Sequence, residues 1–332
     1  MPDPCTSALL DEEGKIVLHK NRKARPEAFL KAIEPYRDDI VVGLKCMFPW
    51  YWLADLCAKE KIPFVLGHAL YMKAIHGGKS KNDRIDSQKI AALLRGGTFP
   101  MAYVYPRKMR LTRDLLRRRN HLVRKRSELL VHIQNTNSQY NLPEFGKKIA
   151  LKANRDGIAD RFPDPSVRKS IEVDLELLDF YDRLLSDLEC YIEKSAKGDN
   201  LHSWYLLRSI PGVGKILGLI LLYEIHDIRR FPRVQDFVSY CRLVKCPRES
   251  GGKKFGAKNS KVGNVHLNWA FSEAACFFLR VSEQTQHYHS RLVSKHGKGK
   301  ALSILAHKIG RAVYFMLKRK EPFSMETFFA HA

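Results

Sequence analysis

The sequence predicts a chain of three parts: an α/β domain in residues 1–106, a coiled-coil arm in residues 107–200 and a mostly α-helical domain in residues 201–332. Strand-like and helix-like patterns alternate in about the first 95 residues, which is typical of a sheet flanked by helices. The apolar spacing then changes to stripes of about seven residues, as in paired long helices. The last part is helical around a PGVG turn. With 332 residues and 45% hydrophobic content, the chain can build a sizeable core.

Within the first part, turn signals separate short apolar runs from amphipathic segments. An acidic turn that ends at Gly14 separates two of these runs and indicates a β-hairpin. A proline suits the first turn of the next helix, and a pair of glycines follows the last one. The predicted elements are a hairpin of residues 7–10 and 15–19, a helix at 26–36, a strand at 40–45, a helix at 49–61, a strand at 63–67 and a helix at 84–95.

Two apolar stripes predict the helices of the arm. Arg118 and Arg126 interrupt the first stripe, and a polar stretch rich in Asn, Pro and Gly, residues 135–165, precedes the second. Because the stripes are complementary, we expect a coiled coil that is either hairpinned on itself or shared between subunits. The stripe residues are Leu111, Leu115, Leu122, Leu129 and Ile133 in the first helix, and Ile171, Leu175, Leu178, Leu185, Leu188 and Ile192 in the second.

The two arm helices differ in charge. Residues 107–126 contain ten Lys or Arg and one acid, Asp114, whereas acids predominate in the second helix. Two interpretations stay open: the basic face pairs with the acidic helix inside the protein, or it faces phosphates. In the second interpretation, Arg117, Arg118 and Arg119 are candidate nucleic-acid contacts.

A tight PGVG turn joins two apolar helical segments in the third part. Glycines let the backbone approach a ligand closely, and amide groups at the start of the next helix can take a phosphate oxygen. These features are typical of a helix-hairpin-helix element that binds DNA phosphates. A plain turn between two helices is the alternative. The residue spacing of a P-loop is absent. Further helices are predicted at 216–225, 264–280 and 301–320. The candidate contacts in the turn are Pro211, Gly212, Gly214 and Lys215.

A flexible loop rich in Gly and Lys is predicted at residues 247–263. Its basic side chains Arg248, Lys253 and Lys254 are candidates for phosphate contact. Surrounding cations can also activate a serine hydroxyl and hold a phosphodiester in place. Ser250 is therefore a candidate nucleophile.

The composition favours a nucleic-acid partner. Lys and Arg number 58 against 35 Asp and Glu, a formal net charge of +23. Self-repulsion makes such an excess costly, so a polyanionic partner explains it better than a merely basic protein. No apolar run reaches the ~18 residues of a membrane span, and the N-terminus lacks the order of a signal peptide. Seven scattered cysteines without a CxxC pair favour reduced thiols. We therefore expect a cytoplasmic, nucleoid-associated protein with no membrane partner.

Two acids, Asp83 and Asp86, are three residues apart at the start of a predicted helix and share one face. Such carboxylates can hold Mg²⁺, and phosphoryl transfer at a diester commonly uses two metal ions. Taken alone, the spacing also suits acids that merely complement the helix dipole.

Four segments carry a resemblance to a known family: KNDRIDSQKIAALLR, SIPGVGKILGLILLYEI, FPRVQDFVSYCRLVKCPRESGG and HGKGKALSILAHKIGRAVYFMLKRK. Over nearly its whole length the chain resembles the DEDD transposases of the bridge-RNA-guided insertion sequences, which are related to the Piv-type invertases. The resemblance implies a RuvC-like, RNase H-like N-terminal fold, a coiled-coil arm and a C-terminal transposase domain. It also implies that Asp83 and Asp86 bind Mg²⁺, that Ser250 attacks DNA, and that a dimer or tetramer recombines DNA with a structured RNA as guide.

The chain departs from the family pattern at two of the four acids. The glutamate expected on the strand before the aromatic-rich helix is Lys45 here. Replacing a negative by a positive charge beside Mg²⁺ should lower metal affinity steeply. The first aspartate belongs at or before Met1, and Asp3 lies between prolines that do not fit mid-strand. A misplaced start codon explains the missing aspartate but not Lys45, so decay or repurposing is the stronger expectation.

Three hypotheses about function follow. The first is an insertion-sequence transposase, or recombinase, whose activity is impaired by the loss of two metal-site acids. The second is a non-catalytic relic that binds DNA or RNA and acts as a dominant-negative regulator of transposition in mixed oligomers. The third is a general helix-hairpin-helix repair or nuclease protein, which accounts for the PGVG turn but not for Asp83 and Asp86.

Overall fold

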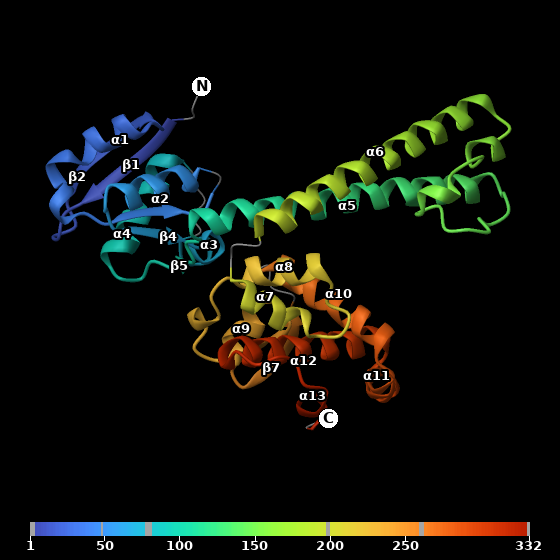
Figure 1. The fold of residues 1–332 in the computed structure, drawn as a ribbon. Helices are drawn as coiled ribbons and strands as arrows, with labels where there is room; N and C mark the ends of the chain where they lie inside the picture. Colours follow the sequence, from blue (N-terminus) through green and yellow to red (C-terminus); the bar gives the residue numbers. More distant parts are fainter. Residues whose placement is uncertain (1–3, 48, 77–81, 197–199, 259–261, 331–332) are drawn as a thin grey trace. The chain divides into compact units, whose positions relative to one another are not determined.

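The computed structural model describes residues 4–47, 49–76, 82–196, 200–258 and 262–330. The chain folds into two compact units, Met1–Arg107 and Lys108–Ala332. The two long helices expected to form an arm belong to the second unit, together with the helical C-terminal part (Figure 1). Among the described residues, no helix combines the length and the apolar character that crossing a bilayer requires.

The first unit contains two small sheets. Strands β1 (Pro4–Leu10) and β2 (Ile16–Lys23) form the expected hairpin. Strand β3 (Val42–Lys45) runs parallel to β4 (Phe64–Gly67), and the short β5 (Met101–Ala102) pairs antiparallel with β4. The expected sheet is thus present as a mixed sheet of three strands, and the hairpin forms a sheet of its own.

Helices cover these strands, and most lie where the sequence predicts them. Helix α1 (Pro26–Ile33) is shorter than expected and continues as a 3₁₀ turn, Glu34–Asp39, because Pro35 cannot donate the next helical hydrogen bond. Helices α2 (Trp50–Lys59) and α4 (Asp83–Arg95) match the prediction, whereas α3 (Ala69–His76) and β5 were not predicted.

A glycine on β3 sets how closely α4 approaches the sheet. A Cβ atom at Gly43 would lie 2.9 Å from Cδ2 of Leu94 on α4. A side chain there would have to displace the end of Leu94, so the bare backbone of the glycine allows this close contact. The ring of His19 on β2 also approaches the start of α4, with Nε2 3.1 Å from the carbonyl oxygen of Arg84. The first turn of α4 therefore contacts β2, and its last turn packs on β3.

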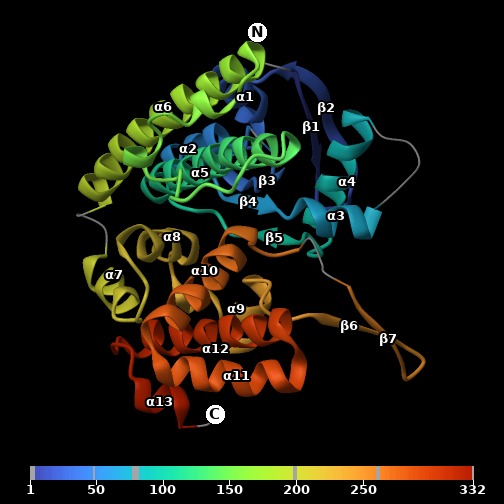
Figure 2. The same cartoon turned by 90° about the vertical axis from the view of Figure 1, so that its right-hand side faces the viewer.

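Two long antiparallel helices begin the second unit. Helix α5 (Arg107–Gln139) lies beside α6 (Pro165–Ala196) in both views (Figures 1 and 2). The predicted α6 stripe is confirmed: Ile171, Leu178, Leu185 and Ile192 recur every seven residues and are buried. The α5 stripe was partly wrong. Leu111 is 58% exposed, and the buried apolar residues of α5 are Leu116 and Ile133.

The segment between these helices is packed against them. Helix α5 continues to Gln139, so the polar stretch expected from residue 135 begins later. Ile149, Ile158 and Phe162 are buried in a cluster with the ends of α5 and α6. Arg155 spans two acids of α6, with Nη1 2.5 Å from Asp179 and Nη2 2.6 Å from Asp182. Ion pairs and an apolar cluster together fix this connection.

The C-terminal part is a bundle around one apolar helix. Every residue of α8 (Lys215–Ile225) from Leu217 to Ile225 is buried, whereas the helices around it are amphipathic. The predicted helices at 264–280 and 301–320 correspond to α10 (Val265–Val281) and α12 (Lys298–Arg319), and α11 (Glu283–His296) between them was not predicted. The other elements are α7 (Leu201–Arg208), a 3₁₀ turn (Ile228–Arg230), α9 (Val234–Tyr240) and α13 (Met325–Phe329).

The loop expected at residues 247–263 is largely a β-hairpin, which corrects the sequence interpretation. Strand β6 (Cys246–Ser250) pairs antiparallel with β7 (Lys253–Lys258), and the hairpin extends from the helices of this part (Figure 2). Gly251 and Gly252 form the turn with φ of 56° and 74°. Two successive residues with positive φ give the two-residue turn that matches strand twist, which explains the hairpin.

A buried ionic network fixes α5 to α8 and α10. Glu224 on α8 is 2% exposed and accepts two hydrogen bonds from Arg117, from Nε at 2.6 Å and from Nη2 at 2.9 Å. Nε of Arg113 lies 3.6 Å from Oε2, and the Asn264 amide donates to Oε2 at 2.8 Å. Burial alone would raise the pKa of Glu224, but the hydrogen bonds and charges of these partners lower it.

We predict that Glu224→Gln destabilises the second unit by about 3 kcal/mol or more at pH 7, because two arginines then lack their buried counter-charge. A lowered folded pKa gives stability that is present above the ordinary glutamate pKa of 4.5 and lost as pH falls below it. Urea unfolding of both proteins at pH 7 and pH 3 should therefore show a difference that shrinks in acid. Glu128→Gln, at an exposed pair with Lys125, is the control with little effect.

Candidate functional site

The two predicted metal ligands occupy the first turn of α4. Asn82 is the N-cap, and its side chain accepts a hydrogen bond from the backbone N–H of Ile85 at 2.7 Å. Asp83 and Asp86 follow in the first turn, where carboxylates are stabilised by the positive end of the helix dipole. Asp83 is close enough to β1 for its charge to act on Cys5: burial raises the pKa of this thiol, and the Asp83 charge raises it further. Asp83 therefore lies near β1.

Lys45, at the end of β3, faces this turn of α4. Its Nζ atom lies 3.9 Å from Oδ2 of Asp86, and both side chains are partly exposed. Helix α4 also packs on this strand further along its length, where Leu94 in its last turn lies against Gly43. Lys45, which stands where the family pattern has a glutamate, thus lies beside the two predicted metal ligands and forms an ion pair with one of them, Asp86.

The residues present do not fit a pair of divalent cations. Mg²⁺ requires several oxygen ligands in octahedral geometry. No group of three or more His, Cys, Asp or Glu side chains in the described part of the chain is placed to hold a metal ion. Instead, the ammonium group of Lys45 already neutralises part of the negative charge of Asp83 and Asp86.

The PGVG turn lies between α7 and α8, as predicted. Gly212 has φ of +86°, and a Cβ atom there would lie 2.7 Å from the backbone carbon of Phe277 on α10. Packing therefore requires this glycine. Gly214 differs: it is the N-cap of α8, and a Cβ atom there would meet nothing within 4 Å. Phosphate binding by this turn stays a prediction.

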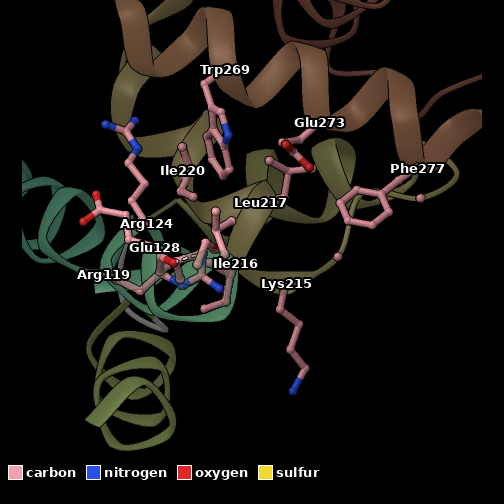
Figure 3. Close-up of a pocket in the computed structure, with 15 residues that line it drawn as sticks. Arg119, Arg124, Glu128, Lys215, Ile216, Leu217, Ile220, Trp269, Glu273 and Phe277 are labelled. Atoms are coloured by element: carbon pink, nitrogen blue, oxygen red, sulfur yellow. Dashed lines mark hydrogen bonds between the residues drawn. The ribbon is translucent and has the colours of Figure 1, made fainter. Parts of the chain in front are cut away.

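A groove of about 1090 Å³ lies beside the turn within the second unit. Helix α5, the turn, α8 and α10 line it, and Trp269 of α10 belongs to its wall. Figure 3 shows that Lys215 points away from the other lining side chains. Lys215 Nζ lies 3.0 Å from Oε2 of Glu193 on α6, so this predicted contact already has a protein partner.

The predicted basic residues of α5 divide into two groups. Arg117 binds Glu224, and Nε of Arg119 donates to Oε1 of Glu189 on α6 at 2.7 Å. Both side chains therefore take part in internal ion pairs: Arg119 pairs with the acidic helix, as one of the two interpretations expects, whereas the partner of Arg117 lies on α8. Arg118 is exposed between them. Among these three arginines it is the one placed to face a ligand.

Ser250 ends strand β6 directly before the Gly-Gly turn. It pairs across the hairpin with Lys253, and both residues are exposed. The side chains of Arg248 and Lys254 lie outside the described part of the structure. The position gives Ser250 an accessible hydroxyl beside a basic residue at a narrow tip, not in the extended flexible loop that the sequence suggested.

Sequence reasoning missed Glu224 and Asn264. The available signal was a single acid within the otherwise apolar KILGLILLYEI helix, since a carboxylate there must be buried with partners. Asn264 directly precedes a helix and caps it, with its side-chain oxygen accepting from the N–H groups of His266 and Leu267. Only the folded structure shows that its amide also reaches Glu224.

Comparisons with known proteins agree on one family. A family model described as Transposase, for the DEDD transposases of IS110 elements, matches residues 5–141. A second, described as Transposase IS116/IS110/IS902 family, matches residues 205–290. The chain is also similar to the transposase for insertion sequence element IS1111A of Coxiella burnetii, with 25% identity across 95% of this chain and 86% of that protein.

We predict that Gly212→Ala lowers stability by about 1–3 kcal/mol, because the new Cβ atom would meet α10 and the backbone would keep a strained positive φ. Gly214→Ala should cost less than about 1 kcal/mol, as for an N-cap glycine in open space. Thermal unfolding of the two variants measures both. Equal melting temperatures would show that packing does not require Gly212.

A second prediction separates the arginines of α5. Arg118→Gln should reduce the slope of log binding constant against log salt concentration by about 0.9, the value for one phosphate contact, without lowering the melting temperature. Arg117→Gln should lower the melting temperature, because it leaves Glu224 with fewer partners. Fluorescence anisotropy of a labelled DNA duplex at several salt concentrations gives the slopes. An unchanged slope for Arg118→Gln would exclude this residue from the DNA-binding surface.

Proposed function

This chain belongs to the IS110 family of insertion-sequence transposases, and from that premise we propose that it binds DNA and a structured guide RNA but does not support normal Mg²⁺-dependent DNA cleavage. The ion pair of Lys45 with Asp86 is the observation that carries this proposal. It puts a fixed cation where the family pattern has an acidic metal ligand.

The nucleic-acid part of the proposal is supported by charge and by exposed groups. The net charge of +23 attracts a polyanion. Ser250 and Lys253 are exposed at the hairpin tip, where the serine hydroxyl would act as the nucleophile toward a DNA phosphate and the lysine would hold that phosphate. Arg118 adds an exposed cation on α5. A homodimer or tetramer would bring two DNA sites together.

The metal part of the proposal follows from electrostatics. Mg²⁺ in this family would be held by carboxylates, of which Asp83 and Asp86 are present. An ammonium within about 4 Å of a carboxylate removes much of its attraction for a second cation, and it repels the cation directly. A glutamate at residue 45 would add a ligand instead. The two-unit change in charge is large enough to decide whether the ion binds.

A second candidate function rests on the same ion pair. A chain that keeps its nucleic-acid surfaces but lacks a working metal site would occupy DNA or enter mixed oligomers without cutting. It would then act as a dominant-negative regulator of an active relative. Co-expression with an active family member distinguishes this role, since the regulator lowers transposition frequency whereas an inert protein does not.

We predict that Lys45→Glu increases the Mg²⁺ affinity of the full chain at least tenfold, because it removes a repelling charge and adds an oxygen ligand. Isothermal titration calorimetry with Mg²⁺ measures the change. Lys45→Met removes the charge without adding a ligand, so its Mg²⁺ affinity should lie between those of the unmodified chain and Lys45→Glu. Adding Asp86→Asn to the glutamate variant should abolish the gain and so locate the ion.

Two results would contradict the proposal. One is Mg²⁺ binding by the unmodified chain as tight as that of Lys45→Glu. The other is recombination of DNA by the unmodified chain in Mg²⁺. DNA binding in the presence of EDTA should be the same for all these variants, because the proposed DNA contacts lie in the second unit.

A further inference from the structure

Helix α6 carries a second apolar stripe on a face that its partner helix does not cover. The heptad of Ile171, Leu178, Leu185 and Ile192 is buried inside the second unit. Val173, Leu177, Phe180 and Tyr191, on other faces, are 44%, 40%, 45% and 60% exposed, and Leu184 is half-buried. Large apolar side chains in a row on a surface indicate an interaction site.

The spacing of this outer stripe specifies a helix as its partner. Val173, Leu177, Phe180 and Leu184 follow steps of four, three and four residues, which is the core pattern of a coiled coil. A helix face with this pattern packs against another helix. Binding to a flat or irregular partner surface would not require apolar residues at this regular spacing. The four residues span about 17 Å of helix.

We propose that the outer stripe is a homodimer interface in which α6 packs antiparallel against α6 of a second copy of this chain. Nucleic acid is disfavoured as the occupant, because α6 contains eight acids and four bases in an otherwise basic protein. The inference gives the oligomer of the proposed function a defined surface, but it does not depend on whether the chain cleaves DNA.

One antiparallel register satisfies both the apolar and the charged residues. Leu177 lies opposite Phe180 of the second copy, and Val173 lies opposite its Leu184; two-fold symmetry repeats both contacts. In this register Glu176, which flanks the stripe, lies opposite Arg183 of the second copy, and the symmetric pair repeats it. Four apolar layers and two ion pairs of opposite charge result.

A parallel arrangement lacks this complementarity. Each stripe residue would then lie opposite its own copy, and the next position of the pattern is Asp187, which would face a second Asp187. Glu176 and Arg183 would not meet across the seam. Within one chain, the Arg183 guanidinium lies 5.4 Å from the Phe180 ring, so it already flanks the stripe at the place the antiparallel register uses.

Charge reversal tests the register directly. Sedimentation equilibrium over a range of protein concentrations measures the dimer dissociation constant. Glu176→Arg alone and Arg183→Glu alone should each weaken the dimer about tenfold, because each creates two like-charge pairs across the seam. The double reversal should return the constant to within about threefold of the unmodified protein. Far-UV circular dichroism checks that the helix content is unchanged.

Apolar variants test the stripe itself. Phe180→Glu should leave the chain monomeric, whereas Leu111→Glu, at a residue of α5 that is more exposed and lies outside the stripe, should not change the mass. A monomer at all concentrations, or single charge reversals without effect, would overturn the inference. Loss of DNA or RNA binding by Phe180→Glu at unchanged mass would also overturn it, since nucleic acid would then be the occupant. A monomeric chain that still binds DNA leaves the proposed function intact.

Discussion

The second unit depends on one buried carboxylate. Glu224 lies on the most apolar helix of the protein, and it has Arg113 and Arg117 from α5 and Asn264 from the start of α10 as partners. A charge so deeply buried is stable only with all of its partners in place. The long helix α5 is thereby fixed to the C-terminal bundle at a single rotation about its axis. That rotation decides which arginines of α5 point inward and which, like Arg118, reach the solvent.

In the first unit, Gly43 on β3 positions a helix because it has no side chain. Gly43 lets Leu94, in the last turn of α4, pack directly on β3, and the first turn of the same helix lies beside Lys45 at the end of that strand. Backbone packing of this kind fixes where residue 45 lies, but it does not depend on which side chain that residue carries. The replacement of an acid by Lys45 therefore changes the charge of the site without requiring a change in the fold.

Most elements could be predicted from the sequence, because strand and helix periodicity and glycine signals are local. The errors arose where a distant contact decides the outcome. Leu111 fits the heptad spacing but is exposed in the folded protein, and Arg126, which interrupts the stripe, is accommodated by Asp182 on α6. Ser250 appeared to lie in a loop because the Gly-Gly turn was not interpreted as a hairpin. The pairing of Lys45 with Asp86 requires the folded register, although the unusual lysine was visible in the sequence.

The tethered ammonium of Lys45 also changes how the first unit responds to its surroundings. Carboxylates gathered for metal binding repel one another when the ion is removed, so such sites loosen under chelation. A counter-charge carried by the chain itself has an effective concentration that dilution and chelators do not lower. The start of α4 in this protein therefore has an electrostatic partner whose presence does not depend on the level of free divalent cation.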